Sequence, residues 1–197
     1  MAFVDAYKVA DEDREKKKVL LKLARESIEK AVGKEDHLSV DTLVEQNPWL
    51  KENGAAFVTL NTKEGALRGC IGSLVAHRKL YEDVIANAQN AALHDPRFVA
   101  LSKDELDNVK VEVSLLTPAE PLEYTSIEDL KSKINVGKDG IVLKQGQYQA
   151  TFLPQVWEQL PSFELFFKYL CKKAGLKEMC LADKPEISVY HVEKYEE

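Results

Sequence analysis

Two pairs of short strands, each joined by a tight turn, place the strongest limit on the fold. Residues 55–61 carry β-branched and aromatic side chains, and a short turn leads directly into a second apolar run at 67–71. Residues 141–144 and 148–153 repeat this arrangement around another glycine-containing turn. Strands joined this closely run antiparallel. Because helices do not alternate regularly with these strands, the sequence predicts an α+β fold with an antiparallel or mixed sheet and packed helices.

Amphipathic helices are predicted to cover the strands. Apolar residues recur at helical spacing over 12–32, 78–93 and 163–173. Alternation of apolar and polar residues over 109–117 and 187–192 predicts two further strands, each with one buried face.

The remaining segments are predicted to be irregular. Residues 38–52 have the pattern of a mixed connector, and the residues after 192 that of a charged tail. The prolines at 118 and 121 bracket an extended link. We therefore expect one domain over residues 1–197, with a weak boundary between two lobes near 118–121.

Composition and cysteine use indicate a cytoplasmic protein. The sequence has no apolar run of about 18 residues, and its N-terminus lacks the apolar core of a signal peptide, so no membrane partner is expected. Three cysteines at wide spacing fit a reducing compartment better than a secreted disulfide framework. The net charge of -6 argues mildly against a large nucleic-acid footprint. A local basic patch is compatible with that charge, so nucleic acid stays open as a partner.

The segment LRGCIG at 67–72 concentrates chemistry-bearing side chains in one strand. Gly69 and Gly72 suggest a bulge or a close approach to the backbone. In a regular strand Arg68 and Cys70 point to the same face. A charged side chain on that face needs solvent or an ion partner, so we expect a groove over this segment.

The candidate catalytic residues are Cys70 and His94. Cys70 could act as a nucleophile if Arg68 or His94 activates its thiol, with His94 as the base. Alternatively, Cys70 is a small buried apolar residue and His94 interacts with the dipole of the helix that it ends. Both alternatives stay open at this point.

The arginines near this strand are the candidate cations for a ligand. Arg68 and Arg97 could grip a phosphate or a carboxylate with two parallel hydrogen bonds. Alternatively, one of them forms a structural ion pair with Glu112 or Asp95, which we favour for Arg97. The candidate ligand-binding residues are Arg68, Gly69, Gly72, Arg97 and Glu112.

The sequence predicts no metal site and names no cofactor. Cys171 and Cys180 have no further ligand at close spacing. The histidines are scattered, at positions 37, 77, 94 and 191. A phosphate loop, a dinucleotide fingerprint and a nucleophile elbow are all missing from the sequence.

Six sequence blocks in order resemble the AMMECR domain family, named after the Alport syndrome, mental retardation, midface hypoplasia and elliptocytosis chromosomal region. They are AFVTL at 56–60, LRGCIG at 67–72, AALHDPRF at 91–98, VEVSLLTP at 111–118, TFLPQVW at 151–157 and LCKKAGL at 170–176. The resemblance implies an α+β protein of two unequal lobes, without a settled biochemical activity. It also implies Memo-like and radical S-adenosylmethionine proteins as partners, and a role in modifying RNA or another biomolecule.

The chain departs from the family pattern in two places. Family members often carry a basic residue where His94 stands, and a hairpin rich in glycine and arginine where this chain has Gln147–Thr151. These departures weaken the case for an anion site at that hairpin.

Two functional hypotheses follow. In the first, the protein is a binding module that presents the Arg68–Gly72 groove to an anionic ligand or a partner. In the second, it is a thiol-dependent enzyme, or a subunit of a biomolecule modification system, in which Cys70 attacks a substrate held by Arg68 and His94 acts as base. The first is favoured slightly, because these residues do not complete a catalytic triad.

Overall fold

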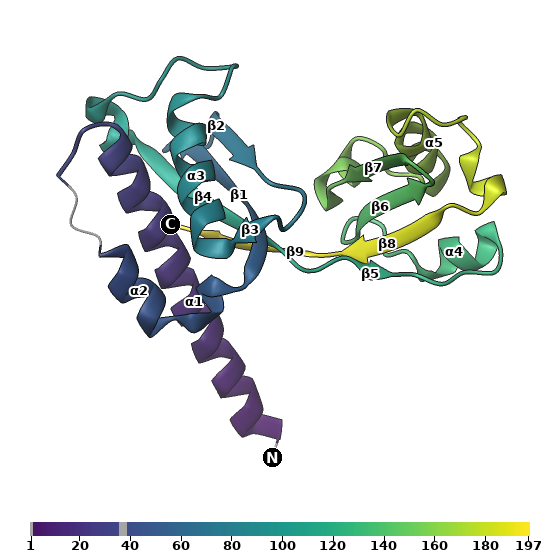
Figure 1. Cartoon of the computed structure of the whole chain (residues 1–197), viewed down its shortest axis with the longest axis horizontal. Coiled ribbons are helices and arrows are strands. Elements are labelled where there is room, and N and C mark those ends of the chain that lie inside the picture. The colour runs from purple at the N-terminus through teal and green to yellow at the C-terminus, as the bar shows by residue number, and fades with distance from the viewer. Residues whose placement is uncertain (1, 36–38) are drawn as a thin grey trace. The chain divides into compact units, whose positions relative to one another are not determined.

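The structure, a computed structural model, describes residues 2–35 and 39–197, with side chains from residue 12 onward, and it divides into two compact units. Unit 1 comprises Met1–Leu115 with Glu193–Glu197, and unit 2 comprises Leu116–Val192 (Figure 1). The first division lies close to the predicted link at 118–121, whereas the return to unit 1 after Val192 had no sequence signal. The α+β class is confirmed.

Unit 1 places helices against a sheet of strand order β2-β1-β4-β9, and β3 also pairs with β1. The strands are β1 (Asn53–Thr62), β2 (Leu67–Gly72), β3 (Arg78–Lys79), β4 (Val109–Leu116) and β9 (Val192–Glu196). Helix α3 (Leu80–Leu93) lies against β1 and β2, and helix α1 (Ala2–Ala31) packs against α3 (Figure 1). A short 3₁₀ helix, η2 (Lys103–Asn108), precedes β4.

The core of unit 1 follows the predicted periodicities. Leu20, Leu23, Ala24 and Ile28 of α1 are fully buried, as are the alternate β1 residues Ala56, Val58 and Leu60. Helix α1 begins at Ala2, well before the predicted start at residue 12. Its buried face is the one predicted from sequence.

The predicted connector at 38–52 is wrong. It contains helix α2 (Val40–Gln46) and a 3₁₀ helix, η1 (Pro48–Lys51), while residue 38 lies outside the described residues. The hydroxyl of Ser39 accepts the backbone N–H of Thr42 at the start of α2, and Leu43 and Val44 are buried. A helix of two turns offers too few residues for its period to stand out.

The predicted charged tail is also wrong, because β9 joins the sheet beside β4. The backbone N–H of Glu197 donates to Val111 O at 3.1 Å, and the Glu197 carboxylate pairs with Arg25. Tyr195 is 4% exposed, and its burial, with Asp13 and Glu193 near its hydroxyl, raises the pKa of that phenol. Charges on the exposed face of β9 hid this strand in the sequence.

Unit 2 packs helices on a sheet of order β5-β8-β6-β7. The predicted hairpin is formed by β6 (Gly140–Gln145) and β7 (Tyr148–Phe152), and β8 (Glu186–Tyr190) pairs with β6 and with β5 (Glu120–Pro121). The helical elements are α4 (Ile127–Lys133), η3 (Pro154–Glu158), α5 (Phe163–Lys173) and η4 (Cys180–Asp183). Trp157 and Phe166 stack in the core with ring centroids 3.6 Å apart.

A disulfide joins Cys171 of α5 to Cys180 of η4. The chain turns back at Gly175 and brings the two Cα atoms within 5.8 Å, a separation that a disulfide spans. The cysteine count had favoured thiols in a reducing compartment, and this pair corrects that interpretation. Cys70 is the free cysteine.

Candidate functional site

The LRGCIG segment forms β2, an edge strand of the unit 1 sheet. Thr59 pairs with Cys70 and Leu60 with Gly69, but the next pair is Asn61 with Leu67. Arg68 is therefore the extra residue of a β-bulge.

The two glycines of β2 serve contacts inside the protein. A Cβ at Gly69 would lie 2.2 Å from the carbonyl oxygen of Ala91 in α3, and a Cβ at Gly72 would lie 2.2 Å from the ring of Phe57. Only glycine permits these approaches. The close approach that the sequence predicted is thus made by α3 and Phe57, and a ligand-binding role for either glycine stays a prediction.

Asp95 and Arg97 cover the free edge of β2 at Cys70. Asp95 Oδ2 accepts the Cys70 N–H at 2.8 Å, and Arg97 Nη2 donates to Cys70 O at 3.2 Å. The two side chains also bind each other, with Arg97 Nε 2.9 Å from Asp95 Oδ1 and Nη2 2.7 Å from Oδ2. The pair therefore satisfies both outward backbone groups of Cys70, as a neighbouring strand would. The predicted ion pair between Arg97 and Asp95 is confirmed.

The two partners differ sharply in exposure. The Asp95 side chain is 1% exposed, and the Arg97 side chain is 54% exposed. Hydrogen bonding to Arg97 holds the pKa of Asp95 well below its usual range, against the opposing effect of burial, and the backbone N–H of Cys70 adds to this lowering. Asp95 in turn raises the pKa of Arg97, and Cys70 contributes in the same direction. The site is thus a buried anion, an accessible cation and a neighbouring thiol.

Arg68 is engaged inside unit 1. Its Nε and Nη2 bind the two carboxylate oxygens of Glu105 at 3.0 and 3.1 Å, and the side chain is 12% exposed. Arg68 lowers the pKa of Glu105, assisted by the backbone N–H of Ser102. Within the described residues, Arg68 Nη1 is buried and has no hydrogen-bond partner. Glu112 lies elsewhere on β4, where it accepts the Ser114 hydroxyl and approaches Lys194 at 3.9 Å.

An aromatic ring and a hydroxyl complete this site, and sequence reasoning missed both. The Phe98 ring faces the guanidinium carbons of Arg68 and Arg97, at 5.9 and 5.6 Å from its centroid. The Thr59 hydroxyl lies 3.2 Å from Cys70 Sγ, across the pair of strands. Thr59 could have been found from the hairpin, because a tight turn sets which residues oppose each other.

Cys70 and His94 are placed differently. Cys70 is half-buried, with Thr59 beside its sulfur. His94 is exposed at the end of α3, and its Nδ1 lies 3.1 Å from Asn90 Oδ1 on the same helix. The described contacts of His94 do not bring it to Cys70, so its role as base stays a prediction.

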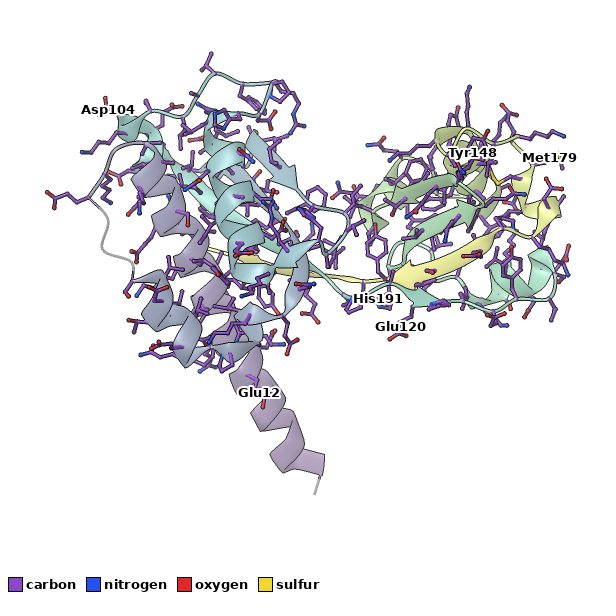
Figure 2. The ribbon with its side chains drawn as sticks, in the orientation of Figure 1. Glu12, Asp104, Glu120, Tyr148, Met179 and His191 are labelled. Carbon is purple, nitrogen blue, oxygen red and sulfur yellow. A yellow bond between two sulfur atoms is a disulfide. The ribbon has the colours of Figure 1, made fainter. Side chains whose placement is uncertain are left out.

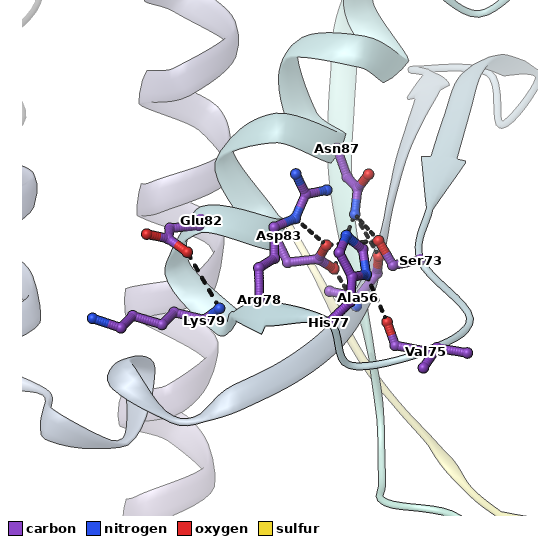
Figure 3. Close-up of polar contacts among 9 residues, drawn as sticks. All are labelled: Ala56, Ser73, Val75, His77, Arg78, Lys79, Glu82, Asp83 and Asn87. Atoms are coloured by element: carbon purple, nitrogen blue, oxygen red, sulfur yellow. Dashed lines mark hydrogen bonds and ion pairs between the residues drawn. The ribbon is translucent and has the colours of Figure 1, made fainter.

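A second buried carboxylate, Asp83, lies near the N-terminal end of α3, whereas Asp95 follows its C-terminal end (Figure 3). Asp83 has no exposed surface and accepts from Arg78 Nε at 2.7 Å, the Ser73 hydroxyl at 2.6 Å, Asn87 Nδ2 at 3.0 Å and the Ala56 N–H at 2.9 Å. This cluster fastens β1 and the segment after β2 to α3. Sequence reasoning missed it, because the partners come from β1, the segment after β2, β3 and α3 itself.

No group of three or more potential metal ligands gathers among the residues whose positions are described. His37, one of the four scattered histidines, lies outside them. In the same part of the chain, no helix is both long and apolar enough to cross a bilayer.

Together, the fold and the site define an α+β protein of two units, with a free thiol on an edge strand that an aspartate and an arginine cover. The AMMECR1 family model matches residues 21–195, and the chain belongs to this family.

Similar proteins come from several organisms. A protein of Nanoarchaeum equitans is 38% identical over 180 residues, which cover 90% of this chain and 98% of that protein. One of Thermococcus gammatolerans is 39% identical and covers 93% of this chain and 89% of its own length. The crystal structure of an uncharacterised protein from Pyrococcus horikoshii matches with a TM-score of 0.70 at 39% identity, and covers 90% of this chain and 89% of that one.

Proposed function

We propose that this protein is a binding module that presents the edge of β2, from Arg68 to Gly72, to an anionic ligand or an acidic partner. The observation that carries the proposal is the 54% exposed side chain of Arg97, which is paired with the 1% exposed side chain of Asp95. An incoming anion meets the cation before it meets Asp95.

Arg97 keeps one donor group for this purpose. Its Nε and Nη2 are used by Asp95 and by the Cys70 carbonyl, whereas Nη1 makes no hydrogen bond to any described residue. Phe98 flanks the guanidinium and limits its movement. Arg68 also lies near the Phe98 ring, with its guanidinium carbon 5.9 Å from the centroid, and its own charge is matched by Glu105. A single exposed ion pair contributes about 0.2–1 kcal/mol, so further contacts along the edge must supply the rest of the affinity.

The proposal is tested with inorganic phosphate as the probe. We expect the backbone amide signal of Cys70 to shift saturably in ¹H–¹⁵N spectra, and Arg97→Gln to abolish the saturation. Arg78→Gln is the matched control, because it removes the same charge from the other buried carboxylate. Cys70→Ser should leave phosphate binding unchanged. Equal effects of Arg97→Gln and Arg78→Gln would contradict a specific anion site.

A thiol-dependent enzyme is the second candidate, with Cys70 as nucleophile and His94 as base. It is favoured by the Thr59 hydroxyl, which donates to Cys70 Sγ at 3.2 Å, and by the Arg97 guanidinium, which binds the Cys70 carbonyl at 3.2 Å. Iodoacetamide should then label Cys70 rapidly at neutral pH, and Thr59→Val and His94→Gln should slow it. The disulfide keeps Cys171 and Cys180 from reacting. Labelling only near an ordinary thiol pKa of about 8.5 would count against this candidate.

The proposed setting in the cell rests on the family resemblance. We place the protein in the cytoplasm, beside Memo-like and radical S-adenosylmethionine proteins, in the modification of RNA or another biomolecule. Disulfides do occur in intracellular proteins of hyperthermophiles, so the Cys171–Cys180 disulfide does not by itself contradict this location. Purification of native complexes, with RNA and proteins identified by sequencing and mass spectrometry, tests the proposal. Recovery of the protein without either class of partner would contradict it.

A further inference from the structure

Unit 2 contains a histidine whose ring is held by a buried carboxylate. Antiparallel pairing sets Gly140 of β6 opposite Tyr190 of β8, so the next residues outward, Asp139 and His191, face each other. His191 Nε2 lies 3.1 Å from Asp139 Oδ1. The Asp139 side chain is 2% exposed, and the His191 side chain is 59% exposed.

Hydrogen bonds hold both the carboxylate and the backbone carbonyl of Asp139 in place. The carboxylate oxygen Oδ2 accepts the backbone N–H of Asn135 at 2.7 Å and Asn135 Nδ2 at 3.2 Å. The backbone carbonyl of Asp139 accepts Trp157 Nε1 at 2.8 Å. The backbone of His191 is fixed as well, because its N–H donates to the Thr117 hydroxyl at 2.9 Å and its carbonyl accepts the Thr117 N–H at 3.0 Å. The backbone of His191 and the carboxylate that binds its Nε2 are therefore both held in place.

This arrangement assigns the proton on the neutral ring. An ionised carboxylate only accepts hydrogen bonds, so His191 Nε2 carries the proton and Nδ1 keeps its lone pair. No described residue donates to Nδ1 in the structure. The ring thus offers a free acceptor to a ligand.

The imidazole borders a cavity of about 410 Å³, within the range of small-molecule sites. Pro118, Pro121, Leu122 and Val189 give it apolar walls. Glu120 lines the same cavity, and Figure 2 labels it close to His191 at one end of unit 2.

The charges around the cavity favour a cation. Among the described residues, the Glu120 carboxylate has no ion-pair or hydrogen-bond partner, whereas the ammonium of Lys133 is occupied by Asp129 Oδ2 at 3.0 Å and Glu123 O at 2.8 Å. Two acceptors, Glu120 and His191 Nδ1, therefore belong to residues that line this cavity, while Lys133, a cation that also lines it, is already held by Asp129 and Glu123.

We propose that this cavity binds a small organic amine, which donates to His191 Nδ1, places its positive charge near Glu120 and packs its apolar body against the proline-rich wall. This cavity is lined by residues of unit 2, whereas β2 belongs to unit 1, so the proposal for the cavity does not depend on the anion-binding function.

Benzylamine is the probe, and benzyl alcohol is the neutral molecule of matching shape. Long-range ¹H–¹⁵N spectra of the full chain should show the neutral His191 ring protonated at Nε2, with Nδ1 shifting saturably on addition of benzylamine. We expect benzyl alcohol to bind about threefold more weakly, the value of one exposed ion pair.

Variants separate the two acceptors. Glu120→Gln should remove the preference for the amine, and His191→Gln should abolish saturable binding of both probes. Glu123→Gln, which changes an exposed carboxylate that does not line this cavity, should leave the preference unchanged. Equal affinities for the two probes, a preference that survives Glu120→Gln, or a proton on Nδ1 would each overturn the proposal.

Discussion

Helix α3 has a buried aspartate at each end, and the two are used differently. Asp83 and Asp95 each accept a backbone N–H from the β1–β2 hairpin, and each binds an arginine. At Asp83 the remaining space is filled by Ser73 and Asn87, and the arginine side chain is 32% exposed. At Asp95 the arginine is 54% exposed and lies beside a free thiol. Exposure of the cation, more than its charge, separates a structural pair from a candidate site.

The largest effect is expected at the closed cluster. Asp83→Ala leaves Arg78 without its carboxylate and the Ala56 N–H without its acceptor, so we expect the free energy of unfolding to fall by about 3–5 kcal/mol. Urea denaturation followed by circular dichroism measures it. Asp107→Ala, at an exposed carboxylate, is the control. A loss as small as that of the control would mean that Asp83 does not hold the hairpin.

A smaller loss is expected at the open cluster. Asp95→Ala removes the acceptor of the Cys70 N–H, which costs about 2–3 kcal/mol, while Arg97 can turn to water. The same denaturation experiment ranks the two variants. If Asp95→Ala destabilised the protein more than Asp83→Ala, the distinction between a closed and an open cluster would be wrong.

The glycines that contact the two ends of α3 also meet different kinds of atoms. A Cβ at Gly69 meets a backbone oxygen at 2.2 Å, whereas a Cβ at Gly54 meets the flexible Leu80 side chain at 2.8 Å. We therefore expect Gly69→Ala to cost about 2 kcal/mol and Gly54→Ala less than about 1 kcal/mol. Thermal unfolding of both variants checks the order. Equal losses would show that α3 moves as easily as a side chain.

The pH dependence gives a finer test of Asp95. Because its pKa is lowered in the folded state, the stability from its ionised form is fully present above the unfolded pKa of about 3.9 and is lost as pH falls through the folded pKa. The difference in unfolding free energy between wild type and Asp95→Asn should therefore stay constant from neutral pH to about pH 4, and shrink below it. Urea titrations across this range measure it. A difference that already shrinks at about pH 5 would contradict the lowered pKa of Asp95.

The sequence predicted the elements whose patterns are local. Helix α5 spans Phe163–Lys173 as expected, both hairpins form, and the bulge in LRGCIG is present. The strand β9 escaped notice because its charged face conceals the alternation. Periodicity reports which face is buried and carries no information about which distant element covers it.

The candidate site was only half visible for the same reason. Arg68 and Cys70 stood out by residue type, but Glu105 lies 37 residues from Arg68 and reaches it only through the fold. The Asp95–Arg97 pair was predictable, since its members are two residues apart. Asp83 carries no local signature, because its partners lie on four different segments, 4 to 27 residues away.

The central claim is that Arg97, whose side chain is 54% exposed, presents a usable cation at the edge of β2, whereas Arg78, at 32%, is less accessible. The ¹H–¹⁵N signals of the two arginine Nε–H groups, followed in one sample during a phosphate titration, test it most directly. We predict a saturable shift for Arg97 and no saturable shift for Arg78. Shifts of equal size at both arginines, or none at Arg97, would contradict it.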